Sequence, residues 1–247
     1  MSSEADGSCR VLGKMQKTIS KYIGVLLLGV AIWSCSETKE VDPSSLGTTY
    51  FPLEVGTYRI YRVEGVRHTS HLDSTIFSYW LKESISDTFT NLEEGTSYAV
   101  VREKRDSETE AWQFDSLWTA RIDERTIVMV ENNVPIVKLA FPTTDSLTWD
   151  SNRLNDKSKN EYTLIDVEEP YTQQFGDFNN TITVLQEFFP DLVVNYIAQK
   201  EVYGKDIGLV FKEDIVLKYR TEDQFINREI LSSGFQYRQY LVEYGQE

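Results

Sequence analysis

The chain has 247 residues, of which 40% are hydrophobic and 26% are charged, which is enough apolar material for a sizeable core and argues against general disorder. Its net charge of -14 argues against a nucleic-acid partner, because phosphate binding requires clustered lysine and arginine. Two cysteines exclude a disulfide framework and a cysteine-based zinc site. The 14 Tyr, 12 Phe and 5 Trp favour strands.

The segment from Met15 to Cys35 has the organisation of an export signal. Lys17 and Lys21 form a basic flank, and an uncharged, mostly apolar run follows over 22–33. This run is too short to span a bilayer, but its length suits the hydrophobic region of a signal peptide. A buried core helix and a retained signal anchor are the alternatives, and the short run disfavours the anchor.

The end of this run, Ile32-Trp33-Ser34-Cys35, resembles a lipobox, the processing site of bacterial lipoproteins. The resemblance implies cleavage before Cys35, which would carry a diacylglyceryl thioether and an N-acyl chain such as palmitate. Trp33 departs from the small residue that the motif prefers. A protein with this modification would be anchored to the outer membrane of the cell envelope, on its periplasmic side or at the cell surface.

Three parts of the chain follow from this interpretation. Residues 1–34 are expected to be a signal peptide, with translation starting at Met15 or with a long basic region, because Glu4 and Asp6 precede the first lysines. Residues 35–49 contain Pro43, Gly47 and several Ser and Thr, and are expected to form a flexible tether. Residues 50–247 show no second linker and no internal repeat, and are expected to form one β domain.

The clearest strand pattern covers residues 112–122. Trp112, Phe114 and Trp118 share one parity and are expected to face the core, whereas Gln113 and Asp115 are expected to face away. A strand over 126–131, a turn at 132–135 and a strand over 136–141 follow. Further strands are expected over 57–65, 74–86, 96–106, 161–167, 181–187, 194–203, 208–219 and 235–244, while 188–198 is expected to be a loop or a short turn.

Long alternating segments in a row of hairpins predict a mainly β fold. We expect a single antiparallel, strongly curved sheet, in the form of a half-barrel or a barrel-like structure. No segment shows a convincing helical period over a dozen residues. Because long strands rich in aromatic residues need a partner layer or closure, the sheet is expected to curve around its own core.

Several motifs resemble a group of uncharacterised exported lipoproteins from Bacteroidota. The opening Tyr50-Phe51-Pro52-Leu53, followed by Gly56, Tyr58 and Tyr61, carries the resemblance. The later run from Glu201 to Lys212 and the ending around Ser233-Gly234-Phe235 also fit. The resemblance implies an exported lipoprotein with a mostly β body and supplies no catalytic residue. Physically, Phe51 and Leu53 are expected to plug one end of a curved sheet, and Gly204 and Gly208 to flank a turn.

No motif in the sequence predicts a catalytic, cofactor or metal site. His68 and His71 could share a metal only if a turn or helix placed them on one side and a third ligand were added. Neighbouring carboxylates occur at 93/94, 123/124, 168/169 and 213/214, and an acidic surface explains them without function. The chain contains no nucleophile elbow, P-loop or dinucleotide fingerprint.

Three Asp-Ser pairs resemble the O-glycosylation acceptor of exported Bacteroidota proteins. They place candidate acceptors at Ser74, Ser116 and Ser146. Ser116 lies within the expected core strand and is therefore discounted. Ser146, in a turn region after Pro142, and Ser74 are the predicted sites.

Three classes of function are compatible with these features. The leading hypothesis is a non-enzymatic binding or assembly lipoprotein that contacts a protein, a glycan or a lipid. The second is a carrier of lipid or acyl chains, which a continuous apolar cavity would support. The third is a hydrolase that uses two carboxylates across a cleft.

Overall fold

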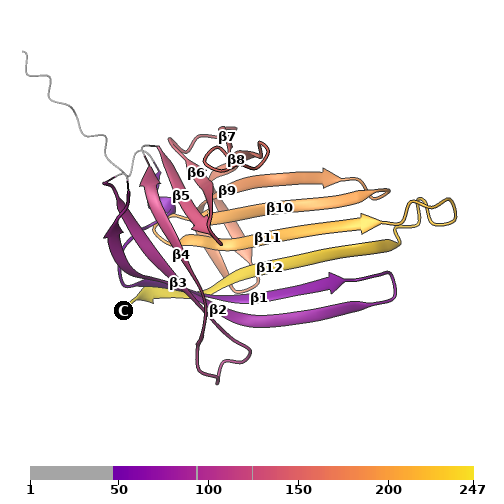
Figure 1. Cartoon of the computed structure of the whole chain (residues 1–247), viewed down its shortest axis with the longest axis horizontal. Helices are drawn as coiled ribbons and strands as arrows, with labels where there is room; N and C mark the ends of the chain where they lie inside the picture. The colour runs from indigo at the N-terminus through magenta and orange to yellow at the C-terminus, as the bar shows by residue number, and fades with distance from the viewer. Residues whose placement is uncertain (1–46, 93, 124) are drawn as a thin grey trace, which may run out of the picture. The chain divides into compact units, whose positions relative to one another are not determined.

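A computed structural model describes residues 47–247 apart from positions 93 and 124. The described chain is almost entirely strand, with one short 3₁₀ turn, η1 (Thr48–Tyr50), before the first strand (Figure 1). The strands are β1 (Thr57–His68), β2 (Ser74–Thr90), β3 (Thr96–Arg105), β4 (Gln113–Asp123), β5 (Thr126–Glu131), β6 (Val134–Ala140), β7 (Thr148–Asp150), β8 (Glu161–Gln173), β9 (Gly176–Pro190), β10 (Asn195–Gly204), β11 (Gly208–Tyr219) and β12 (Leu231–Gln246).

All twelve strands belong to one antiparallel sheet that is nearly closed into a barrel. Each strand pairs with its neighbour in sequence except β6 and β7, and β12 pairs with β1 over Thr57↔Gln246 to His68↔Gly234. Two hydrogen bonds bridge the β6–β7 seam: Val137 N–H donates to Ser151 O at 2.9 Å and Trp149 Nε1 donates to Val137 O at 2.9 Å. The predicted strongly curved antiparallel sheet is therefore confirmed.

The strands differ in length and direction. In Figure 1, β9 to β12, β1 and β2 run side by side toward one end, whereas β3 to β6 lie at the other end. The hairpin between β8 and β9 bends back over the outside of this sheet, where Tyr171 packs on Phe211 with ring centroids 5.6 Å apart and Phe175 packs on Tyr240 at 5.8 Å. The bend coincides with a break in the β8–β9 register between Ile165 and Glu169. The outer face of β10 to β12 is thereby partly covered.

One part of the inner face is filled by apolar side chains. Ile127, Leu139, Leu164, Ile182 and Val184 of β5, β6, β8 and β9 are all fully buried in a single cluster. Removing this apolar surface from water drives folding of this part of the sheet. The other part of the inner face, around β1 to β3 and β10 to β12, contains many polar side chains and holds the cavity described below.

The orientation predicted for residues 112–122 is wrong at its N-terminal half. Arg102 pairs with Ser116 and Glu103 with Phe114, so Asp115 is the extra residue of a β-bulge. The bulge reverses the parity of the strand, because each residue before it moves to the opposite face. Phe114 is accordingly 69% exposed, while Ala120 is buried. Trp118 keeps the predicted orientation and lines the cavity.

The predicted turns lie where they were expected, although the turn expected over 132–135 is shorter because β6 begins at Val134, and one predicted loop is corrected. Asn132 and Asn133 both have positive φ between β5 and β6, as a tight hairpin of this type requires. Asp206 and Gly208 also have positive φ in the β10–β11 turn. The expected loop at 188–198 is much shorter, because β9 continues to Pro190 and β10 begins at Asn195. No helix in the described part of the chain has the length and apolar character needed to cross a membrane.

Candidate functional site

A cavity of about 300 Å³ lies against the inner face of the sheet. Its wall combines apolar side chains from the chain's opening segment, including Phe51 and Leu53, with ionisable side chains from β1 to β3, β5, β6, β10 and β11. The opening segment is held in place by Tyr50, which is buried and donates a hydrogen bond to Asn180 Oδ1. Phe51 and Leu53, which were expected to plug one end of the sheet, thus line this interior cavity.

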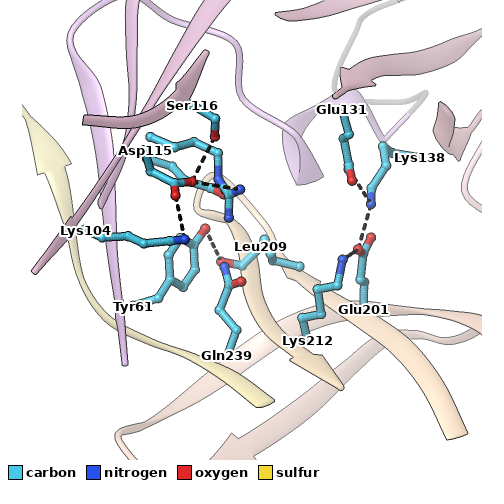
Figure 2. Close-up of polar contacts among 12 residues, drawn as sticks. Tyr61, Lys104, Asp115, Ser116, Glu131, Lys138, Glu201, Leu209, Lys212 and Gln239 are labelled. Carbon is cyan, nitrogen blue, oxygen red and sulfur yellow. Dashed lines mark hydrogen bonds and ion pairs between the residues drawn. The ribbon is translucent and has the colours of Figure 1, made fainter. Parts of the chain in front are cut away.

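Glu201 is the centre of a buried ionic network in this wall (Figure 2). Its carboxylate is 2.6 Å from Lys138 Nζ and 3.0 Å from Lys212 Nζ, and it accepts a hydrogen bond of 2.6 Å from Tyr203 OH. Lys138 also lies 3.1 Å from Glu131. Two carboxylates and two ammonium groups therefore neutralise one another, which reduces the cost of burying all four charges.

The pKa values in this network follow from burial opposed by charge. Burial alone would raise the pKa of the Glu201 carboxyl, but attraction from Lys138 and Lys212 outweighs it, so that pKa lies well below its usual range. The same balance, with Lys138 as the chief partner, lowers the pKa of Glu131. Burial, reinforced by the charge of Glu201, raises the pKa of Tyr203 well above its usual value, so its hydroxyl remains a donor.

A second ionic group lies on β2, β3 and β4. Arg102 Nε is 2.9 Å from Glu83 Oε1, and the Arg102 guanidinium also stacks 3.7 Å from the centre of the Trp118 ring. Asp115 is 2.5 Å from Lys104 Nζ, as drawn in Figure 2. Asp115 also lies 3.7 Å from Arg102. The bulge in β4 makes these contacts possible, because it turns Asp115 toward the inner face.

Two buried donors in the cavity wall have no hydrogen-bond partner among the described residues: Gln239 Nε2 and Trp118 Nε1. Gln239 is 2% exposed, its Oε1 accepts from Tyr237 OH at 2.6 Å, and its cross-strand neighbour on β11 is Lys212. Close by, Tyr61 donates from its hydroxyl to Leu209 O at 3.2 Å. A buried donor without a partner is uncommon and costs about 1–3 kcal/mol, so its presence suggests a site for an acceptor.

Two carboxyl groups of the wall, Glu131 and Glu201, and the neighbouring Asp115 are held as fixed charges. Burial opposes ionisation of Asp115, yet hydrogen bonds from Lys104 and Ser116 lower its pKa, as cationic neighbours do for Glu131 and Glu201. A glycosidase general acid needs a raised pKa, which none of these three carboxyls has. No cluster of three metal-ligating side chains occurs among the residues that the structure describes.

The residues that the sequence singled out lie apart from this cavity. Cys35 is outside the described residues. Ser74 and Ser146 are both exposed, at the start of β2 and in the β6–β7 connection. His68 Nε2 lies 3.1 Å from Gln236 Nε2 and His71 is exposed in the next turn, so the structure does not bring them together with a third metal ligand.

The charged residues of the cavity were missed by sequence reasoning. Their signal was present, because Lys138 interrupts the apolar run 134–141 and Glu201 precedes Val202 and Tyr203 in a strand that ends fully buried. Lys138 is moreover the extra residue of a bulge, since Val128 pairs with Val137 and Ile127 with Leu139. A bulge leaves no trace in a period-two pattern, so the meeting of Lys138 with Glu201 could not be inferred.

No family model matches this chain, and no curated protein matches it either. The chain is similar to a solved structure from Bacteroides fragilis named "putative exported protein with YmcC-like fold", at 14% identity over 79% of this chain and 98% of the other, with a TM-score of 0.39. It is also similar to a "putative lipoprotein" from Parabacteroides distasonis, at 12% identity with the same coverage and a TM-score of 0.37. Likenesses this low carry no inference about this chain.

Proposed function

We propose that this chain is an exported lipoprotein, anchored to the outer membrane by acyl chains on Cys35, whose sheet binds a small ligand in its interior cavity. The basic flank, the short apolar run and the lipobox-like residues before Cys35 support the anchor. Two or more acyl chains hold a protein firmly, because each buried CH₂ contributes about 0.8 kcal/mol. Residues 36–46 then serve as the tether between the membrane and a single domain. The domain begins slightly before residue 50, because Gly47 is buried and Asp206 N–H donates to Thr49 O.

The observation that carries the binding role is the polar cavity itself. The same sheet fills its other inner part with fully buried aliphatic side chains such as Leu164, so this fold is able to close its interior. In the other part, the sheet instead surrounds a cavity of about 300 Å³ with aromatic and charged side chains. That volume is at the lower end of the range for small-molecule sites, which extends over about 300–1,000 Å³.

The two alternative functions fit this cavity less well. A carrier of acyl chains needs a continuous apolar channel, whereas Glu201, Lys138, Lys212 and Arg102 line this one. A carboxylate-based hydrolase needs a general acid, and the pKa values of Glu131 and Glu201 are lowered by their lysine neighbours. A binding role without catalysis uses the cavity as it stands.

The binding role is tested with a chemically mixed fragment library that contains neutral, anionic, cationic and aliphatic compounds. Ligand-observed NMR on the full-length protein in detergent should detect fragments that compete for one site. Val100→Phe fills the cavity wall and should abolish their binding, whereas Val101→Phe, whose side chain points to the other face, should leave it unchanged. Fragments that bind equally to the Val100→Phe variant, or no fragment at all, would contradict the proposal.

The anchor is tested separately by metabolic labelling with a fatty acid. The wild type should incorporate label, and Cys35→Ala should incorporate none. Cys9→Ala provides the matched control, because the only other cysteine lies in the segment that cleavage before Cys35 removes. Equal labelling of the Cys35→Ala variant would overturn the assignment.

We also propose Ser146 and Ser74 as O-glycosylation sites. Both side chains are exposed and both follow an aspartate, which supports access by a transferase. Mass spectrometry of protein purified from a Bacteroidota host should detect a glycan at Ser146 that Ser146→Ala removes. If every copy of the tryptic peptide that contains Ser146 lacked a glycan, this site would be contradicted.

A further inference from the structure

The charges that line the cavity are equal in number, and protein groups already contact each of them. Four carboxylates and four cationic side chains line it. Glu83 pairs with Arg102, and Glu131 and Glu201 pair with the two lysines. The remaining two use neutral partners: Asp214 accepts from Gln199 at 2.6 Å and Arg59 donates to backbone carbonyls of Ile207 and Pro52.

To be neutralised, an ionic ligand would have to displace a partner from one of these ion pairs or compete with the hydrogen bonds that already hold Arg59 and Asp214. Displacing one partner leaves the other charge buried and unpaired, which is costly in a low-dielectric interior. An uncharged ligand leaves every pair intact. The charge balance of the wall thus selects against anions and cations alike.

The wall also specifies the hydrogen-bonding character of the ligand. The two unpartnered groups, Gln239 Nε2 and Trp118 Nε1, are both donors. An indole N–H donates only, and the Gln239 carbonyl already accepts from Tyr237. A ligand that satisfies both groups must present acceptor oxygens, and discrimination against a compound without them is strong because the donors are otherwise left unpaired.

A row of stacked aromatic rings adds a preference for a flat apolar face. Tyr79, Phe77, Phe235 and Tyr237 stack in sequence with interplanar angles of 21°, 15° and 21°. The Phe77 ring lies against Gly65, where a Cβ would come 2.3 Å from this ring, so the glycine is needed for Phe77 to take its place in the row. Three of its members, Tyr79, Phe235 and Tyr237, line the cavity.

From these features we infer that the cavity takes an uncharged, oxygen-rich ring compound of about monosaccharide or disaccharide size, through hydrogen bonds to Gln239 and Trp118. The inference rests on the proposed binding function and specifies its ligand class. Such a ring offers hydroxyl and ether oxygens to the two donors, and its C–H face packs on aromatic side chains. Charged derivatives of the same ring should bind more weakly, because the charged side chains of the wall already have partners within the protein.

The test titrates the full-length protein with matched probes by ligand-observed NMR and calorimetry. The probes are neutral methyl glycosides of several hexoses and the disaccharide maltose, with glucuronate as the anionic counterpart, glucosamine as the cationic one and decanol as the aliphatic one. At least one neutral glycoside should bind, and its charged counterparts should bind at least about tenfold more weakly.

Two variants locate the binding on the named donors. Gln239→Glu keeps the acceptor for Tyr237 but removes the amide donor, and Trp118→Phe keeps a ring beside Arg102 but removes the indole N–H. Each substitution should weaken the binding of the neutral glycoside by about tenfold. Gln236→Glu and Trp80→Phe are the matched controls, because neither residue lines the cavity, and both should bind as the wild type does.

The possible outcomes separate this inference from the proposed function. If only charged or aliphatic compounds bind and Val100→Phe blocks them, the cavity is a binding site but the ligand class is wrong. If a neutral glycoside binds the Gln239→Glu and Trp118→Phe variants as tightly as the wild type, the inferred contacts are wrong. If no probe and no fragment binds, the inference and the proposed function both fail. Thermal unfolding of each variant checks that the loss of binding is not a loss of fold.

Discussion

The two parts of the inner face differ in how they fill the space that the sheet encloses. Around β5, β6 and β8, side chains such as Ile127, Leu139 and Leu164 are fully buried and pack on one another. Around β1 to β3 and β10 to β12, the inner positions include Glu201 and Arg102, and space for a ligand remains. One continuous hydrogen-bonded sheet thus supports both, which shows that the strands supply the frame while the inward side chains decide between packing and binding.

Removal of Glu201 should lower the free energy of unfolding more than any other change considered, because Glu201 is the buried centre of the ionic network. Glu201→Leu leaves Lys138 and Lys212 without their shared partner and should lower the free energy of unfolding by about 3–5 kcal/mol in urea titrations. Glu222→Leu, which breaks the exposed pair with Arg220, should cost about 1 kcal/mol or less. Equal effects would mean that solvent reaches the Glu201 network freely.

A truncation in the apolar part should cost somewhat less. Leu164→Ala removes a fully buried side chain and should lower the free energy of unfolding by about 2–5 kcal/mol, depending on how far the cluster collapses. Leu117→Ala, at a position that is 57% exposed, should stay within about 0.5 kcal/mol. If Leu164→Ala left the free energy of unfolding unchanged, the packed apolar cluster would not be the source of stability in this part of the sheet.

Lowering the pH should have a smaller and gradual effect on stability, and this effect should depend on the charged part of the inner face. The pKa of Glu201 is lower in the folded protein than in the unfolded chain, where a glutamate titrates near about 4.3, so below about pH 5 the unfolded state binds the proton first. This carboxyl should contribute a loss of up to about 1.4 kcal/mol per pH unit as the pH falls. In urea titrations at pH 5, 4 and 3, Glu201→Leu should lose stability less steeply than Leu164→Ala. Parallel slopes would rule out this role for Glu201.

The smallest effect is expected outside both parts. Phe114→Ala, on the exposed side of the bulge in β4, should change the free energy of unfolding by about 0.5 kcal/mol or less. Trp118→Ala, on the inner side of the same strand, should cost clearly more, since it removes the ring under Arg102. The reverse order in urea unfolding would show that the strand faces the other way.

Local patterns were sufficient to predict much of this fold. The strand over 126–131 and the Asn132-Asn133 turn were predicted correctly, because alternation and residues that tolerate positive φ are local signals. Curvature followed from long aromatic strands in a row of hairpins. The pairing of β12 with β1 was not predictable, since it joins residues about as far apart as the domain allows.

The candidate site was less accessible to sequence reasoning than the fold. Its charged members come from strands that are distant in sequence, and two of them, Asp115 and Lys138, are aimed by bulges. A bulge reverses the faces of a strand without altering its composition, so the alternation misplaced Phe114 and Asp115 together. The unpartnered donor of Gln239 depends on the positions of atoms in three dimensions, which no pattern reports.

The pairing of β12 with β1 has a consequence for the order in which the molecule can be made. Until Leu231–Gln246 has been synthesised, β1 has one free edge, because β12 is the strand that pairs there. Closure of the ring is therefore a late, non-local step, and every shorter nascent chain exposes a strand ready to pair with a neighbouring molecule.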